Sequence, residues 1–251
     1  MARALFVSLL FLFVFAAKAS SQPATTDEVL RDVRTSITLN QLSAERILIG
    51  IDHGLDAAGY ALKFIENSRV IHEEFREIAE RLPGVRAIIA VGPDGRLEID
   101  SYQFPAPDVN LGDREYVKQS RLGRGLYMGA AKIGRTSGIP FLPVSKLVGD
   151  HVIAAIISPH FLIHEEGRCA DCVSAILRED GTLLASFPPA AQIPPNILSM
   201  PMVNRNIEGN SASLFSKTSS VIGWRRSEMF PFIALSARGV RSSAPIGIDD
   251  R

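Results

Sequence analysis

Several polar side chains between positions 113 and 146 have the chemistry to bind a small anionic molecule. Arg114 carries a planar guanidinium that can donate two parallel hydrogen bonds to a carboxylate. Tyr116 and Tyr127 can form an apolar wall while each presents a hydroxyl group. Lys146 can add a second positive charge, and Ser145 a hydroxyl. The candidate ligand-binding residues are Asp113, Arg114, Tyr116, Tyr127, Ser145 and Lys146.

The neighbours Asp113 and Arg114 also have a purely structural interpretation. An acidic residue near the start of a helix is favoured by the helix macrodipole, so both side chains could simply cap and brace a helix. In that case replacing Arg114 would lower stability by about 1 kcal/mol and leave ligand affinity unchanged. The sequence leaves both interpretations open.

A second group of candidate residues lies between positions 160 and 172. Cys169 and Cys172 form a C-x-x-C motif, and because Val173 follows, it is not a haem-attachment motif. His160 and His164 would share a face if this segment is helical, and the four side chains could together supply a tetrahedral zinc site. The spacing matches no familiar zinc motif. We predict a local disulfide between the cysteines, with redox-active thiols or a metal site as alternatives.

Composition and motifs argue against several other classes of protein. The chain has 27 basic and 27 acidic side chains, and this zero balance gives no reason to propose a nucleic acid as partner. The sequence has no G-x-S-x-G elbow, Walker A loop or G-x-G-x-x-G fingerprint. We therefore expect neither an enzyme nor a bound cofactor, with an unrecognised exported hydrolase as the remaining alternative.

The first 19 residues resemble an export signal. Arg3 precedes an apolar run over 4–17, and an A-x-A pattern over 17–19 follows. The run has 14 residues, whereas a spanning helix needs about 20. We therefore favour a signal peptide, with a short uncleaved anchor as the alternative. Either one predicts a periplasmic or extracytoplasmic protein, exported or held at the inner membrane.

The next segment is predicted to be one long helix. From Leu30 to Ile65 apolar residues recur at steps of three and four, and no proline interrupts them. We assign residues 26–67 to a stalk helix that lies along two domains or forms a dimer contact. A coiled coil is disfavoured because the pattern is interrupted by Asn40, Gly50, Gly54 and Gly59.

Two similar hairpins indicate a duplicated module. Predicted strands 85–91 and 96–101 flank one Asp-Gly turn, and strands 173–177 and 182–187 flank another, 86 residues later. Further strand pairs are predicted at 141–148 with 152–157 and at 221–226 with 232–237, whereas 194–210 is loop-rich. We therefore expect an α+β fold, with antiparallel sheets that have helices to one side and a polar tail at 241–251.

The order of short motifs resembles that of the double Cache (PDC-type, PAS-like) sensor domains of bacterial receptors. The motifs are Asp100-Ser101, N-L-G-D-R-E-Y-V at 110–117, G-L-Y-M-G at 125–129, G-R-T-S-G at 134–138, P-V-S-K at 143–146, A-I-L-R-E-D-G-T-L-L-A-S-F-P at 175–188 and F-P-F-I-A-L-S at 230–236. The resemblance implies a membrane-distal Cache module over 68–165 and a membrane-proximal one over 166–240. It also implies that the distal module binds a small metabolite.

Two departures from the family pattern limit what the resemblance implies. The amino-acid-binding branch has an R-x-W-Y pattern, and the tryptophan is missing from Arg114-Glu115-Tyr116-Val117. Typical receptors continue into a return transmembrane helix and an output domain, whereas this sequence ends at Arg251. We therefore expect a stand-alone sensor, a partner-dependent one or a shortened receptor.

The sequence thus predicts an extracytoplasmic sensor domain that binds a small anionic ligand and passes the signal by contact. Its expected partners are the small-molecule ligand and either a second copy, joined through the N-terminal helix, or a separate signalling protein. The alternative function is a redox or metal sensor that uses Cys169 and Cys172.

Overall fold

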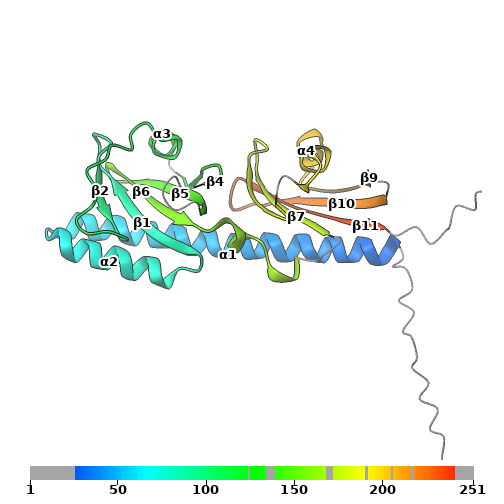
Figure 1. The fold of residues 1–251 in the computed structure, drawn as a ribbon, viewed down its shortest axis with the longest axis horizontal. Helices are drawn as coiled ribbons and strands as arrows, with labels where there is room; N and C mark the ends of the chain where they lie inside the picture. The colour runs from blue at the N-terminus through cyan, green and yellow to red at the C-terminus, as the bar shows by residue number, and fades with distance from the viewer. Residues whose placement is uncertain are drawn as a thin grey trace, which may run out of the picture.

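The computed structural model shows two antiparallel sheets placed one after the other along a single long helix (Figure 1). It describes residues 26–123, 125–133, 139–167, 172–189, 192–204, 206–215 and 218–240. The predicted signal peptide or anchor at 1–19 and the predicted tail at 241–251 lie outside these residues. Of the helices described, none combines the length and the apolar character needed to cross a membrane.

Helix α1 (Thr26–Phe64) has the buried apolar face that its sequence spacing predicts. Val33, Ile37, Ile51 and Leu55 are each at most 5% exposed. The 39 residues make a helix about 58 Å long, which runs beneath both sheets. The predicted α+β fold class, with a long N-terminal helix and two antiparallel sheets, is confirmed.

Two glycines on α1 allow close packing against the rest of the first module. A Cβ atom at Gly59 would lie 2.3 Å from Cγ1 of Val148, and one at Gly54 would lie 2.7 Å from Cδ1 of Leu82. The nearest atom to a Cβ at Gly50 is 3.5 Å away, which is ordinary van der Waals contact. The glycines at 54 and 59, which disfavour a coiled coil, are thus sites of close approach.

Gly59→Ala is therefore expected to lower the free energy of unfolding by about 1 kcal/mol. Overpacking against Val148 costs about 1–3 kcal/mol, and the better helix propensity of alanine offsets up to about 1 kcal/mol of it. The matched control Gly50→Ala has room for the methyl group and should raise stability by up to about 1 kcal/mol. Urea unfolding of both variants checks this, and equal stabilities would contradict it.

In the described part of the chain, the first module contains a six-stranded antiparallel sheet and two helices besides α1. Its elements are α2 (Ser68–Arg81), β1 (Val85–Val91), β2 (Leu97–Asp100), α3 (Glu115–Leu122), β3 (Tyr127–Met128), β4 (Lys132–Ile133), β5 (Pro140–Val148) and β6 (His151–Ile157). The strand order is β2-β1-β6-β5-β3, with β4 paired to β5. Every pair is antiparallel, and both predicted strand pairs of this half are present.

The second module repeats this topology. Two short 3₁₀ helices, η1 (Pro159–Leu162) and η2 (Glu165–Gly167), precede β7 (Cys172–Arg178), β8 (Leu183–Phe187), α4 (Pro195–Val203), β9 (Glu208–Phe215), β10 (Thr218–Arg226) and β11 (Phe232–Val240). The order β8-β7-β11-β10-β9 matches that of the first sheet strand for strand. The Asp-Gly turns match too, because Gly95 and Gly181 both have positive φ, at 87° and 90°.

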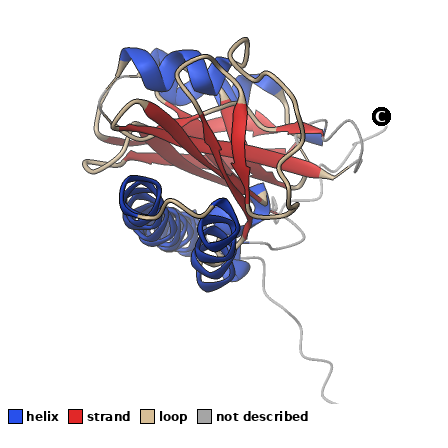
Figure 2. Ribbon diagram, turned by 90° about the vertical axis from the view of Figure 1, so that its left-hand side faces the viewer, coloured by secondary structure: helices blue, strands red, loops and turns tan. Residues whose placement is uncertain are grey.

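Helices cover both faces of each sheet, so the prediction of helices to one side was wrong. Helices α1 and α2 lie on one face, and α3 and α4 lie on the other (Figure 2). Strand β1 explains the arrangement: Ile88 and Ala90 pack toward α1, whereas Ile89 and Val91 pack on the α3 side. A strand that is apolar along its whole length is buried on both faces.

The loop predicted over 194–210 contains a helix and the start of a strand. Helix α4 begins at Pro195, a residue suited to the first helical position, and buries Ile197 against the second sheet. The helix was missed because its residues are almost uniformly apolar, which gives no 3.6-residue pattern, and because Pro201 lies inside it. Strand β9 follows from Glu208.

One continuous core joins α1 to both sheets. Leu48 of α1 belongs to the same cluster of buried side chains as Ile88 and Ile153 of the first sheet and Ile176 and Phe232 of the second. Smaller clusters lie beneath α3 and α4 on the opposite faces. The two modules therefore share their main core through α1.

Where α1 crosses the second sheet, some of its buried contacts are polar. Asn40 is fully buried; its side-chain amide donates to Oγ of Ser174 at 3.1 Å and accepts from the backbone N–H of His164 at 2.9 Å. Glu45 accepts a hydrogen bond of 2.7 Å from the hydroxyl of Ser227. These contacts satisfy polar groups that burial would otherwise destabilise.

Candidate functional site

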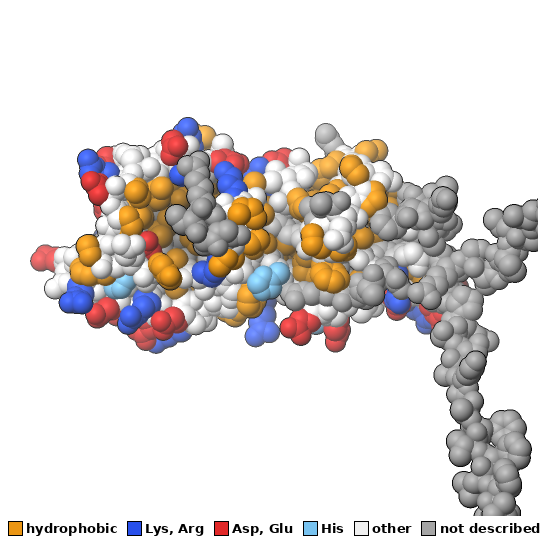
Figure 3. Space-filling model, in the orientation of Figure 1, with side chains coloured by type: hydrophobic (Ala, Val, Ile, Leu, Met, Phe, Trp, Pro, Cys, Tyr) orange, Lys and Arg blue, Asp and Glu red, His pale blue; other side chains and the backbone are white. Residues whose placement is uncertain are grey.

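The candidate residues 113–116 lie at the start of α3, in a charged region of the first module (Figure 3). Arg114 is the N-cap residue, and its carbonyl accepts from the N–H groups of Val117 and Lys118 at 3.1 and 3.0 Å. Its side chain makes no capping hydrogen bond. The Arg114 side chain is 41% exposed, and its Nε lies 3.7 Å from Oδ1 of Asp113. The helix start therefore does not use the Arg114 guanidinium, which stays available.

Tyr116 packs between α3 and the sheet. Its ring packs against a small cluster that includes Ile89, Val91 and Val152 of β1 and β6. Burial raises the pKa of the Tyr116 hydroxyl to about 12, with a smaller opposing effect of the charge on Arg114. The hydroxyl is therefore neutral at physiological pH and can act as a donor or an acceptor.

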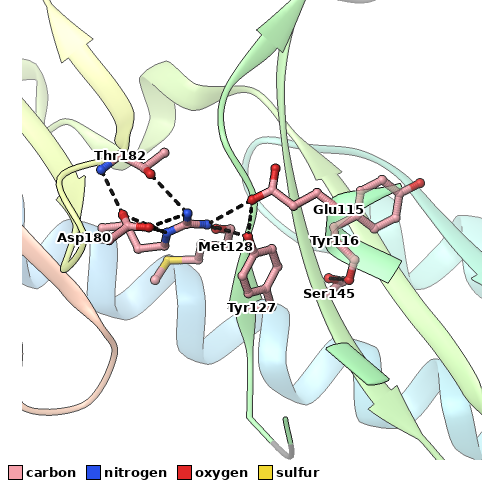
Figure 4. A network of polar contacts seen from close by, with 8 residues as sticks. Glu115, Tyr116, Tyr127, Met128, Ser145, Asp180 and Thr182 are labelled. Atoms are coloured by element: carbon pink, nitrogen blue, oxygen red, sulfur yellow. Dashed lines mark hydrogen bonds and ion pairs between the residues drawn. The ribbon is translucent and has the colours of Figure 1, made fainter. Parts of the chain in front are cut away.

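Ser145 connects β5 to α3 from inside the protein. It is fully buried, its Oγ lies 2.8 Å from Oγ of Ser120, and it donates to the carbonyl of Tyr116 at 3.2 Å. All of these contacts are with α3. Ser145 therefore fixes the helix that carries Arg114 onto the sheet (Figure 4).

Lys146 lies on the opposite face of the same sheet from the other candidates. Its Nζ pairs with Oδ1 of Asp52 and with a carboxylate oxygen of Asp56, both at 2.8 Å, and both aspartates belong to α1. Burial alone would lower the pKa of Lys146, but the hydrogen bonds that its amine donates to the two aspartates raise the pKa above its usual value. Because successive strand residues face opposite sides, Ser145 and Lys146 cannot both face α3.

Tyr127 contacts a residue of the second module that sequence reasoning missed. Its hydroxyl donates to Oε1 of Glu115 at 2.5 Å and accepts from Nη1 of Arg178 at 2.6 Å (Figure 4). The guanidinium carbon also lies 5.2 Å from the centre of the tyrosine ring. Burial, followed by the bond to Glu115, raises the pKa of Tyr127 to about 12. Tyr127 thus lies at the junction of the two modules.

Comparisons with solved structures identify the fold. The extracellular domain of the histidine kinase rpHK1S-Z16 is 22% identical, with a TM-score of 0.68, and the match covers 84% of this chain and 94% of that one. The sensory domain of the Campylobacter jejuni chemoreceptor Tlp3, with isoleucine bound, is 9% identical with a TM-score of 0.63 and coverages of 85% and 93%. The chain has the double Cache fold.

A third double Cache structure agrees with these two. The ligand-binding domain of the Pseudomonas fluorescens chemoreceptor CtaA, in complex with L-isoleucine, is 12% identical with a TM-score of 0.62, and the match covers 82% of this chain and 92% of that one. No family model and no curated protein matches the sequence. The three structures nevertheless confirm, at the level of the fold, the double Cache resemblance that the sequence motifs indicate. All three are domains of receptors and none is an enzyme domain.

One residue of the predicted cysteine pair, Cys172, lies at the start of the second module. Cys172 is buried at the start of β7 and is disulfide-bonded, whereas Cys169 lies outside the described residues, so the pairing stays a prediction. His160 belongs to η1, which ends at Leu162, so it does not share an α-helical face with His164. Within the described ranges no group of three or more metal-binding side chains is present.

One feature of the sequence involves Arg178, although it does not mark the residue as functional. Its position in the R-E-D-G turn of the second hairpin belongs to the motif that resembles the Cache family. That motif indicates a turn, but not that the arginine reaches Tyr127 from the other module. The double Cache architecture makes this contact possible because it places the two sheets end to end along α1 (Figure 1).

Proposed function

We propose that this chain is an extracytoplasmic sensor domain whose first module binds a small metabolite with a carboxylate group. The fold supports the sensor role, because the structures that share it are the extracellular domain of a histidine kinase and the sensory and ligand-binding domains of two chemoreceptors. Two of those domains contain isoleucine, which carries a carboxylate. The ligand class proposed here rests on the side chains of this chain.

The observation that carries the proposal is the state of Arg114. Among the described residues its ionic partner is Asp113, at a distance too long for a strong hydrogen bond. The start of α3 adds a partial positive charge from its free N–H groups. A carboxylate can therefore bind the guanidinium through two parallel bonds without displacing an existing one.

The remaining candidates are proposed to shape and support this site. Tyr116 supplies the apolar wall, Asp113 orients the guanidinium, Ser145 holds α3 in place, and Tyr127 closes the side that faces the second module. Lys146 is left out of the site because its amine is paired on the α1 face. The missing tryptophan of the amino-acid-binding pattern leaves both amino acids and other small carboxylates as candidates.

A ligand screen tests the proposed function directly. The purified chain is melted with each of the amino acids and with small mono- and dicarboxylic acids, and hits are confirmed by calorimetry. A true ligand at 100 times its dissociation constant should add about 2.7 kcal/mol of stability. Matched amides and esters of the hits, which lack the carboxylate charge, serve as controls and should give no shift.

Two outcomes would contradict the proposal. Equal shifts with a carboxylate and its amide would show that the anion is not recognised. A melting temperature that responds to reductant or zinc, and to no carboxylate, would favour the redox or metal sensor based on Cys169 and Cys172.

A further inference from the structure

Arg178, the last residue of β7, has a guanidinium that is bonded on one side to its own hairpin and on the other side to the first module. Nε and one N–H of Nη2 bind the carboxylate of Asp180, at 3.0 and 2.6 Å, and Nη2 also donates to Oγ1 of Thr182 at 3.1 Å. Nη1 donates to the hydroxyl of Tyr127 at 2.6 Å and to the carbonyl of Met128 at 2.9 Å. All five N–H groups of the guanidinium thus have an acceptor.

The two sides of this guanidinium serve different modules. Asp180 and Thr182 belong to the same hairpin as Arg178 and fix its orientation, whereas Tyr127 and Met128 belong to β3 of the first module. The Arg178 side chain is only 17% exposed. The hydrogen bonds that Arg178 donates to Asp180 raise the pKa of Arg178 above its usual value, so the positive charge is permanent.

The contact continues through Tyr127 to the start of α3. The Tyr127 hydroxyl, which accepts from Arg178, donates to the carboxylate of Glu115, and Nη1 of Arg178 lies 3.6 Å from the same carboxylate oxygen. Glu115 directly follows Arg114 in the chain. A cation of the second module therefore compensates the negative charge next to the guanidinium proposed to bind the ligand.

We propose that Arg178 is a positioning residue of the first module's ligand site and couples that site to the second module. It holds Glu115 and Tyr127 together, which fixes the first turn of α3 and keeps the Glu115 carboxylate away from Arg114. Without Arg178, this carboxylate is free to pair with Arg114 or to repel an anionic ligand. The proposal rests on the proposed function, since it assigns a task to the same site.

The coupling works in both directions. If a ligand changes the position of the first turn of α3, it changes the Glu115–Tyr127–Arg178 contacts and therefore the β7–β8 hairpin of the second module. By linkage, a partner that binds the second module and changes ligand affinity by some factor has its own affinity changed by the ligand by that same factor.

Backbone hydrogen exchange in the full chain without ligand tests the positioning role. In Arg178→Ala the amides of α3 should exchange at least about tenfold faster, since charge-assisted hydrogen bonds are lost. The matched control is Arg226→Ala, because Arg226 also ends a strand of the second module, and its guanidinium donates to the carbonyls of Pro201 and Asn206 in that same module. Equal α3 exchange in the two variants would overturn the proposal.

Two further variants separate charge compensation from simple loss of packing. Glu115→Gln introduced into Arg178→Ala should restore most of the α3 protection, because no uncompensated carboxylate remains. A role in packing alone would give no such rescue. Tyr127→Phe removes only the bridging hydroxyl and should also speed α3 exchange, so the test stands even if Arg178→Ala fails to fold.

Calorimetry with L-isoleucine, the amino acid bound by two structural neighbours, distinguishes the two proposals. Binding by the wild type that weakens about tenfold in Arg178→Ala, and not in Arg226→Ala, supports the coupling. Binding that Arg178→Ala leaves unchanged overturns the coupling and leaves the proposed function intact. Absence of heat with the wild type counts only against amino-acid binding, and the α3 exchange then decides the role of Arg178.

Discussion

Arg114→Ala is expected to weaken carboxylate binding by more than tenfold, with little change in the stability of the free protein. The substitution removes a charge-assisted pair and leaves the bound anion uncompensated. In a fully buried site this costs about 2–5 kcal/mol of binding. Because the Arg114 side chain is 41% exposed in the free protein, solvent reduces the expected loss to the low end of that range, about 2 kcal/mol. The free protein should tolerate the change because the side chain makes no capping hydrogen bond and is 41% exposed. Calorimetry with the carboxylate selected by the screen gives the affinity, and a melting curve without ligand gives the stability.

Lys118 provides a matched control on the same helix. It is exposed, it carries the same charge, and it lies one turn after Arg114. Lys118→Ala should leave affinity within about twofold, since an exposed charge that makes no hydrogen bond to the ligand carboxylate is weakened by solvent and salt. If Arg114→Ala lowers the melting temperature and binds as tightly as the wild type, then Arg114 only braces the helix.

Lys146→Ala should have the opposite result, with a loss of stability and unchanged ligand affinity. The substitution leaves the carboxylates of Asp52 and Asp56 close together without their shared cation. Breaking a fully buried pair costs about 3–5 kcal/mol. Because these aspartates are 32% and 40% exposed, solvent reduces the expected loss to about 2 kcal/mol. Urea unfolding measures it.

The pH dependence of this loss follows from the raised pKa of Lys146. A raised folded-state pKa means that the stability from the ion pair is fully present below the unfolded value of 10.5 and is lost as pH rises through the folded-state value. The stability difference between the wild type and Lys146→Ala should therefore be constant near neutral pH and shrink above about pH 10.5.

The double replacement of Asp52 and Asp56 by asparagine provides the control for Lys146. In the Lys146→Ala background it should recover most of the lost stability, because it removes the like-charge repulsion. A Lys146→Ala variant that keeps its stability and loses affinity would instead return Lys146 to the ligand site.

Local sequence signals predicted the features that depend on local physics. The α1 helix followed from its 3.6-residue pattern, and the two hairpins followed from Asp-Gly turns, where glycine supplies the positive φ of Gly95 and Gly181. Helix α4 was not predicted because its apolar segment, with Pro201 inside, has neither helical periodicity nor a composition that favours a helix. Hydrophobic periodicity indicates a helix or strand only where one face of it is apolar and the other is polar.

In the candidate site too, the sequence predicts local neighbours but not contacts between distant segments. Arg114 and Tyr116 are two positions apart at the start of a short helix, so the sequence places them near each other. Strand alternation could have separated Ser145 from Lys146, but only tertiary structure shows which of the two faces α3. Arg178 was missed because its contact with Tyr127 spans 51 positions and two modules, and no local pattern encodes such a pair.

The core that α1 shares with both sheets has a consequence for how this protein unfolds. Detaching either sheet would expose the apolar face of α1 beneath it, and the packing of that face supplies most of the stability of such a helix. The two topologically repeated halves therefore form one cooperative thermodynamic unit rather than two independent domains. A stabilising contact made in either half then raises the free energy of unfolding of the whole chain.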